Sequence, residues 1–174
     1  MNLSRGSQGG GKERGITLTE LLMVSAILGF LLTLGARLFI SIDRYFRLNS
    51  ARVEIQRDAE RVTTLVHRYL SKADPWSVTV DQAFPFNTNP AFSRIQFITI
   101  DGSTVTFWQD QRTFYLAVNG STQTLSQNVR GVAFVYPDIV KLGDLLFSVT
   151  TEKSIGGGQT KTTHTLQSRI RMVN

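Results

Sequence analysis

A run of uncharged residues from Leu21 to Ala36 constrains this chain most, because it has the composition of a membrane span. With its apolar neighbours the segment extends from Ile16 to Ile42, and a helix needs about 20 apolar residues to cross a bilayer. Glu20 and Arg37 are the only charged residues inside this longer segment. A carboxylate at the head of a span needs an explanation, because membrane carboxylates are mostly paired and functional.

The first fifteen residues are polar and rich in glycine and serine, which indicates a disordered tail. Their basic residues also suit a cytoplasmic flank or the start of an export signal. No small-residue cleavage pattern ends the apolar run, so we expect the span to be retained. Because arginines also follow the span, the distribution of basic residues does not indicate which end of the span is cytoplasmic. These arginines are Arg37, Arg44, Arg47 and Arg52.

The residues Gly15–Leu22, GITLTELL, resemble the cleavage site of type IV prepilins and type II secretion pseudopilins. The resemblance implies that a prepilin peptidase cuts after Gly15 on the cytoplasmic side and methylates the new N-terminus at Ile16. Glu20 would then be the fifth mature residue and face the N-terminal amine of a neighbouring subunit during assembly. This chain departs from the family pattern at Ile16, which replaces phenylalanine, at Thr19, and at Arg37, where many pilins carry proline.

The resemblance also implies a location and partners. The chain would insert in the bacterial inner membrane as a single-pass protein with its C-terminal domain in the periplasm. It would then enter a periplasmic or extracellular filament as a structural minor subunit, at the tip or in initiation. The implied partners are the prepilin peptidase, other pilin or pseudopilin subunits, the inner-membrane assembly platform and membrane lipid.

Small residues recur every four positions within the span, at Ser25, Gly29 and Thr33. On a helix they share one side, where a second helix could approach closely. Chance spacing in a leucine-rich segment explains the same pattern, and both interpretations stay open.

Beyond the span the chain becomes amphipathic. No proline occurs between Ile16 and Lys72, so one helix can continue outward. An apolar stripe is predicted at Leu48, Ile55, Ala59, Val62, Val66 and Tyr69. Charged residues stand at spacings that favour pairing within the helix, namely Asp43 with Arg47, Glu54 with Arg57 and Asp58 with Arg61.

From residue 74 onward β-branched and aromatic residues dominate, with hairpin turn signals at Asp101-Gly102 and Asn119-Gly120. We expect a packed loop at 81–93, a flexible link at 155–158, and strands that form one antiparallel sheet covered by the helix. The predicted strands are 76–80, 94–101, 104–108, 112–118 and 122–125, followed by alternating positions at 132–136, 145–149 and 166–172.

These patterns predict an α+β fold with four parts: a cleaved leader at 1–15, a transmembrane half-helix at 16–42, an amphipathic half-helix at 43–73 and a sheet domain at 74–174. Residues 43–174 would form one globular head. A long N-terminal helix on an antiparallel sheet is also the pilin architecture. Within that family, Ala51–Leu70 and Asn128–Tyr136 resemble the J-type minor pseudopilin or the W-type minor pilin.

Residues suited to catalysis are sparse. The chain has no cysteine and only two histidines, His67 and His164, which we interpret as a solvated helix residue and a strand residue. No hydrolase, zinc-protease or phosphate-loop motif occurs, so we expect no enzyme activity, metal or cofactor.

Two alternatives stay open beside the filament subunit. The net charge of +6 suits a minor pilin that binds DNA or another surface through its arginine and lysine side chains. The chain could also be a signal-anchored periplasmic protein outside any filament.

Overall fold

The computed structural model describes residues 15–137, 143–155 and 160–172. The predicted leader, apart from Gly15, and residues 156–158 of the predicted link lie outside these ranges. Ile155, a predicted part of that link, belongs instead to a strand. The chain divides into two compact units, one ending at Arg44 and the other beginning at Tyr45. Helix α1 (Leu18–Leu70) contributes residues to both units and is the only helix longer than one turn among the described residues.

The predicted unbroken helix is confirmed. Helix α1 contains 53 residues and no proline, which would remove a backbone hydrogen bond and clash with the preceding turn. The chain leaves the helix after Leu70, and Pro75 follows within a few residues.

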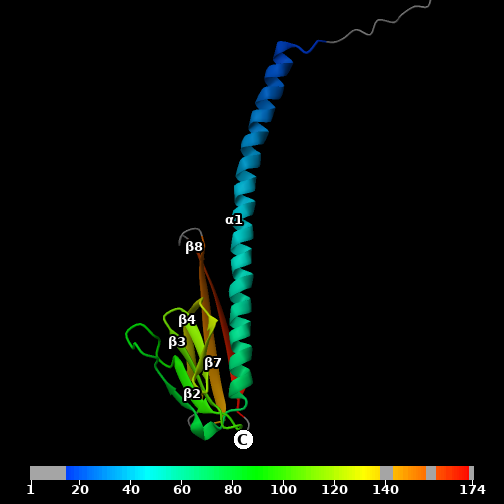
Figure 1. Cartoon of the computed structure of the whole chain (residues 1–174). Helices are drawn as coiled ribbons and strands as arrows, with labels where there is room; N and C mark the ends of the chain where they lie inside the picture. The colour runs from blue at the N-terminus through cyan, green and yellow to red at the C-terminus, as the bar shows by residue number, and fades with distance from the viewer. Residues whose placement is uncertain (1–14, 138–142, 156–159, 173–174) are drawn as a thin grey trace, which may run out of the picture. The chain divides into compact units, whose positions relative to one another are not determined.

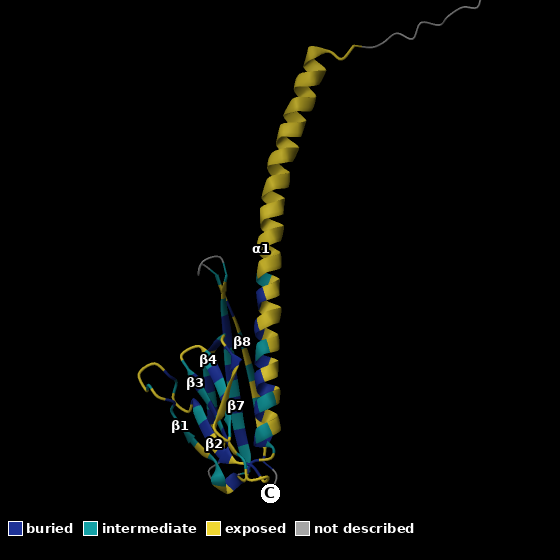
Figure 2. Ribbon diagram, viewed as in Figure 1, coloured by how far each residue is buried: buried dark blue, intermediate teal, exposed yellow. Residues whose placement is uncertain are grey.

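Helix α1 buries one stripe within the second unit, which Figure 2 shows as dark blue along part of the helix. Most of the predicted stripe is confirmed, but Leu48 and Tyr69 are only half-buried. The buried positions advance by three or four residues, as expected for one side of an α-helix. They are Ala51, Ile55, Ala59, Val62, Val66 and Leu70.

Two of the predicted ion pairs within the helix are wrong, because both carboxylates have partners on other elements. Glu54 pairs with Lys153. Asp58 accepts hydrogen bonds from Asn128 Nδ2 at 2.9 Å and from Ser126 Oγ at 3.2 Å. These residues are distant in the sequence, so helical spacing could not identify them.

The first sheet has five antiparallel strands in sequential order: β1 (Thr79–Asp81), β2 (Arg94–Ile98), β3 (Thr104–Asp110), β4 (Thr113–Val118) and β5 (Ser121–Ser126). Both predicted hairpin turns are confirmed. Gly102 has a φ of 79°, and Asn119 and Gly120 have φ values of 49° and 83°. Positive φ at both central residues is the requirement of the tight turn that joins β4 to β5.

A second antiparallel sheet has the order β6-β7-β8 and is built from β6 (Val129–Val135), β7 (Asp144–Ile155) and β8 (Thr160–Arg171) (Figure 1). The prediction of a single sheet is therefore wrong, although the antiparallel strands and their alternating burial are confirmed. Leu145, Phe147 and Val149 of β7 are completely buried.

A buried glutamine side chain joins the two sheets. Gln109 in β3 is 1% exposed, and its Oε1 accepts a hydrogen bond from Val132 N at 2.8 Å. Its Nε2 donates to Gln111 O at 2.6 Å and to Arg130 O at 3.2 Å. The Gln109 side chain thus satisfies backbone groups of β6 that a neighbouring strand would otherwise pair.

Two local predictions before β2 need correction. The predicted strand 76–80 begins instead as a 3₁₀ turn, Pro75–Ser77, because Asp74 Oδ1 accepts a hydrogen bond from Trp76 N at 3.1 Å. The loop 82–93 packs through its polar residues, with Asn89 and Ser93 buried. Its phenylalanines point outward instead, and Phe84, Phe86 and Phe92 are 76%, 63% and 54% exposed.

One hydrophobic core lies between the second-unit part of α1 and both sheets. Phe107 of β3 lies near its centre, with its ring 5.9 Å from that of Phe114 and 6.0 Å from that of Tyr69. Phe134 and Phe147 contribute a second ring pair at 5.1 Å. The α+β arrangement follows from this shared core, because the helix stripe and the inward faces of the strands bury one another.

Candidate functional site at the start of the long helix

The bond predicted to be cleaved, between Gly15 and Ile16, lies in non-helical backbone just before α1. Both residues are exposed, and the Ile16 side chain is 74% exposed. A Cβ atom added at Gly15 would meet no atom within 4 Å. The described residues therefore leave this bond accessible and place no steric demand for glycine at position 15.

Thr17 caps the first turn of α1. Its Oγ1 accepts a hydrogen bond from Glu20 N at 3.3 Å, and its carbonyl oxygen accepts from the backbone nitrogens of Glu20 and Leu21, both at 3.1 Å. Threonine followed three residues later by glutamate is the capping-box pattern. This pattern is visible in the sequence and marks Thr17 as the residue that caps the start of the helix.

Glu20 therefore has a local role as well as a predicted assembly role. It is the acidic residue of the first turn, where a negative charge interacts favourably with the helix dipole. Within the described ranges, no residue donates a hydrogen bond to its carboxylate or forms an ion pair with it. The carboxylate is thus available to a positive group from outside these residues.

The predicted small-residue side of the helix is present, and its polar atoms are satisfied internally. Ser25 Oγ donates to Leu21 O and Thr33 Oγ1 donates to Phe30 O, each at 2.8 Å. A Cβ added at Gly29 would meet nothing within 4 Å. Gly29 follows Glu20 by nine residues, about two and a half helical turns, so the small residues and the carboxylate lie on opposite sides of α1.

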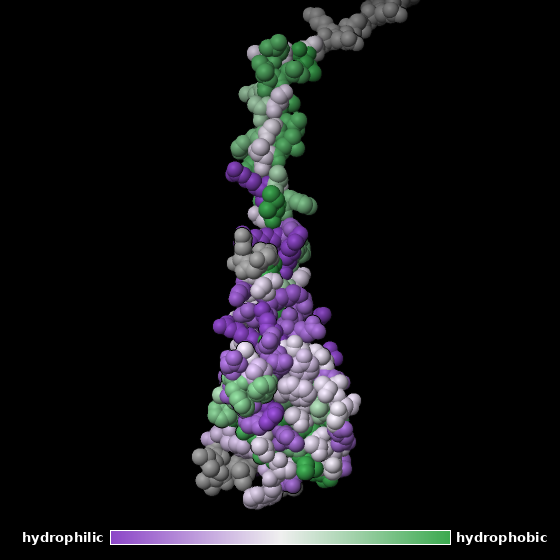
Figure 3. All heavy atoms as spheres, turned by 60° about the vertical axis from the view of Figure 1, so that its left-hand side comes forward, coloured by the Kyte–Doolittle hydropathy of each residue, from purple (hydrophilic) through white to green (hydrophobic). Residues whose placement is uncertain are grey.

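The apolar side chains of the first unit are exposed on all sides, and Figure 3 shows this part of α1 as mostly green. No described residue before Tyr45 is buried. The segment is long and apolar enough to cross a membrane. An apolar surface of this size marks contact with lipid or with other proteins. Its largest side chains include Leu21, Met23, Ile27, Phe30, Leu31 and Phe39.

The second unit contains one buried carboxylate surrounded by cations. The side chain of Glu152 in β7 is 7% exposed, with Arg112 Nη2 3.2 Å from Oε1 and Arg130 Nη1 3.4 Å from Oε2. Lys161 Nζ lies 3.7 Å from Oε1. Arg112 Nη2 also donates to Glu152 O at 2.9 Å. The carboxylate thereby connects the turn between β3 and β4 with β6, β7 and β8, which is a structural role.

We expect Glu152→Gln to lower the free energy of unfolding by about 1–3 kcal/mol, because three cations lose their shared anion. The exposed arginine and lysine heads are screened by water, which keeps the effect below that of a fully buried pair. Chemical denaturation of the full chain in detergent measures the change. Asp101→Asn, in the exposed turn before β3, serves as the control and should change stability by less than about 0.5 kcal/mol. Equal effects of the two substitutions would contradict the role of Glu152.

Two other titratable groups have displaced pKa values. The hydrogen bond that Arg94 donates to the Asp81 carboxylate raises the pKa of Arg94, and burial raises the pKa of Tyr136. Both shifts favour the protonated forms that arginine and tyrosine already have at neutral pH. Neither group is thereby prepared to take up or release a proton in a reaction near pH 7.

The histidines lie in separate elements. His67 is exposed near the end of α1, and His164 is half-buried in β8. Among the residues that the structure describes, no group of three or more histidine or acidic side chains could hold a metal ion.

Comparison with protein-family models, curated proteins and solved structures finds no match to this chain.

Proposed function

We propose that this chain is a pilin-like structural subunit that is processed between Gly15 and Ile16 and then assembles through its long helix. The observation that carries the proposal is the start of α1. An accessible glycine-led bond precedes a capped first turn. Glu20, whose carboxylate has no partner among the described residues, heads an exposed apolar helix segment.

The two physical environments of such a subunit explain the exposed segment. In a membrane, lipid covers the apolar side chains, and Glu20 at the head of the span can reach the polar interface. In a filament, the same side chains are covered by helices of neighbouring subunits. Glu20 is then removed from water and needs a positive partner. A newly formed N-terminal amine on a neighbouring subunit has the required charge.

The second unit would lie outside the membrane. Its part of α1 and both sheets share one hydrophobic core, so this unit would fold as a whole. As a minor subunit, the chain would cap or prime a filament in a secretion system or a pilus. Its action would depend on helix packing and charge neutralisation rather than on reaction chemistry. Its partners would be the prepilin peptidase, related subunits and an assembly platform in the bacterial inner membrane.

N-terminal sequencing and intact-mass measurement test this proposal directly. When the full chain is expressed with a prepilin peptidase and purified from membranes, we expect it to begin at a methylated Ile16. An intact Met1 under the same conditions would support a signal-anchored protein outside any filament. A cut at another bond would contradict the assignment of Gly15 and Ile16.

A further inference from the structure

Among the strands that the structure describes, none lies beside the outer edge of β8. Strand β8 is twelve residues long and pairs only with β7, in a register from Asp144 opposite Arg171 to Ile155 opposite Thr160. An edge strand presents alternate backbone N–H and C=O groups that can pair with another extended chain. Proteins usually shorten or cover such edges, so an open edge of this length is a candidate binding surface.

Two pockets follow this edge, and both lie between β8 and the second-unit part of α1. The first has a volume of about 420 Å³ and is lined by Arg52, Ile55 and Gln56 from the helix and by residues 161–164 from the strand. The second has a volume of about 340 Å³ and is lined by Glu60, Thr63, Thr64, His67 and Leu166. We call this pair of pockets the α1–β8 groove.

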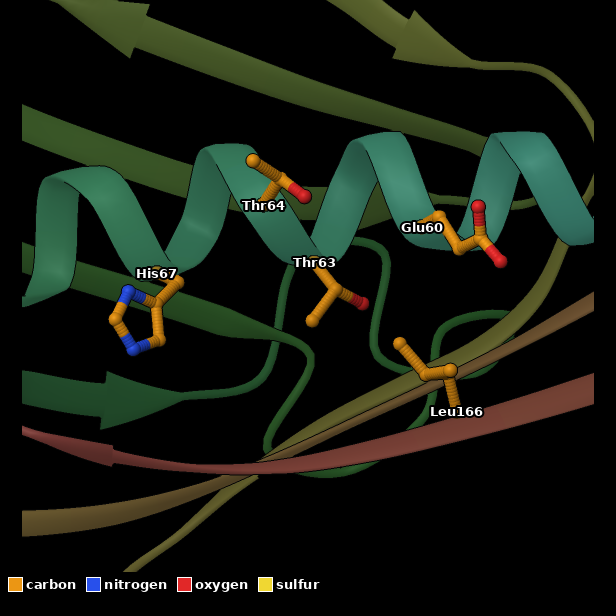
Figure 4. A pocket seen from close by; sticks show the side chains of 5 residues that line it. All are labelled: Glu60, Thr63, Thr64, His67 and Leu166. Carbon is orange, nitrogen blue, oxygen red and sulfur yellow. The ribbon is translucent and has the colours of Figure 1, made fainter.

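Each pocket contains a buried polar atom without a hydrogen-bond partner. They are His164 Nε2 in the first pocket and Thr63 Oγ1 in the second. Thr63 is only 9% exposed, and Figure 4 shows its side chain directed from the helix toward Leu166 of β8. Buried polar groups are nearly always paired, so the two orphaned atoms leave two hydrogen-bonding positions in the groove open to a ligand.

The charges of the groove indicate the ligand. Strand β8 carries Lys161, Arg169 and Arg171 and no acidic residue. Arg52 lines the groove and has no ion pair with any residue within the described ranges. A second copy of β8 paired antiparallel to the first would bring like charges together, which is unfavourable. Lys161 and Arg169 already have carboxylate partners, Glu152 at 3.7 Å and Asp144 at 2.6 Å. A chain with carboxylates opposite Arg52 would therefore be attracted.

We propose that the α1–β8 groove binds an extended acidic segment of another protein, which adds as a fourth strand beside β8. Its backbone pairs with the open edge, and its carboxylates contact Arg52. The Thr63 hydroxyl donates to a backbone carbonyl of the segment, and His164 Nε2 bonds to a polar group of it. This interaction is independent of processing at Gly15 and of any filament.

Synthetic peptides and the full chain in detergent micelles test the proposal. The probe is a peptide of the length of β8 with alternating valine and threonine and two glutamates at one end. One control peptide carries lysines in place of the glutamates. Two further control peptides carry N-methyl groups on alternate backbone nitrogens. In one of them the methyl groups lie along one edge, and in the other they lie along the opposite edge. Each peptide is thereby blocked from strand pairing on its methylated edge only.

We expect the acidic peptide to bind saturably and to slow hydrogen exchange of β8 amides. Methylation along one peptide edge should abolish binding, whereas methylation along the other edge should leave binding unchanged. Arg52→Glu should weaken binding at least about tenfold and favour the lysine peptide. Thr63→Val should weaken binding while leaving the charge preference intact.

Arg57→Glu is the matched control, because Arg57 is an exposed residue of the same helix that does not line the groove. It should bind the acidic peptide as the unchanged chain does. The proposal is overturned if no acidic peptide binds at millimolar concentration, if both methylated peptides bind normally, or if the lysine peptide binds equally well. An equal loss in Arg57→Glu and Arg52→Glu would also overturn it.

Discussion

Gly15→Val should leave the leader attached to essentially all of the protein when the chain is expressed with a prepilin peptidase. A peptidase that closes around glycine before the cut bond has no room for a branched side chain. In this chain, by contrast, a Cβ at position 15 would meet no described atom within 4 Å, so the substitution should not disturb α1. Gly15→Ala, which adds a single methyl group, should show an intermediate loss. Intact mass measures the processed fraction in each case.

Gly29→Val is the control for this experiment. Gly29 is also exposed and also has empty space at its Cβ position, but it lies inside the helix, fourteen positions after Gly15. Its substitution should leave processing at the level of the unchanged chain. Normal removal of the leader from Gly15→Val would refute the cleavage assignment. A block in both variants would point to failed membrane insertion instead.

Glu20→Gln should be processed normally and then fail to assemble, with incorporation into filaments reduced at least about a hundredfold. Glutamine keeps the capping-box pattern with Thr17, so the first turn of α1 is retained. What the variant loses is the negative charge. A positive group of a neighbouring subunit would then be removed from water without a partner, which is strongly unfavourable. The assay compares filament-bound and membrane-bound protein in cells that assemble filaments of this type.

Glu20→Asp preserves the negative charge, so this variant should keep much of the incorporation into filaments. If Glu20 acted only as a local helix cap, Glu20→Gln would assemble as well as the unchanged chain. Asp101→Asn removes an exposed carboxylate from the second unit, and this variant should assemble normally. Full incorporation of Glu20→Gln would exclude charge neutralisation as the role of Glu20. Loss of processing in this variant would instead place Glu20 in recognition by the peptidase.

Local patterns predicted the elements of the fold well but not their partners. The unbroken helix, the alternating strands and both hairpin turns depend on neighbouring residues, so periodicity and turn chemistry identify them. The contact between the two sheets includes Gln109, whose amide bonds backbone groups of β6 more than twenty residues away, so no local pattern could show where one sheet ends and the other begins. The same limitation applies to Glu54 and Asp58, which bond to Lys153 and Asn128 instead of helix neighbours.

The outward phenylalanines of the loop 82–93 show a further limit of composition. Aromatic residues beside prolines predict a packed loop, yet here Asn89 and Ser93 are inside and Phe84 is outside. The buried hydroxyl bonds across the loop, since Ser93 Oγ accepts from Ala83 N at 3.1 Å, and the buried amide bonds to the turn between β3 and β4, since Asn89 Oδ1 accepts from Gln111 N at 2.8 Å. Such bonds join residues that no local pattern connects.

The candidate processing site could be found from the sequence because it is linear. A glycine-led bond, a glutamate five residues later and an apolar run occupy consecutive positions, and helical geometry alone relates them. Tertiary structure decided the surfaces formed by distant segments, above all the α1–β8 groove. Its orphaned Thr63 and His164 lie about a hundred residues apart in the chain, and only packing of the helix against the second sheet places both beside the open edge of β8.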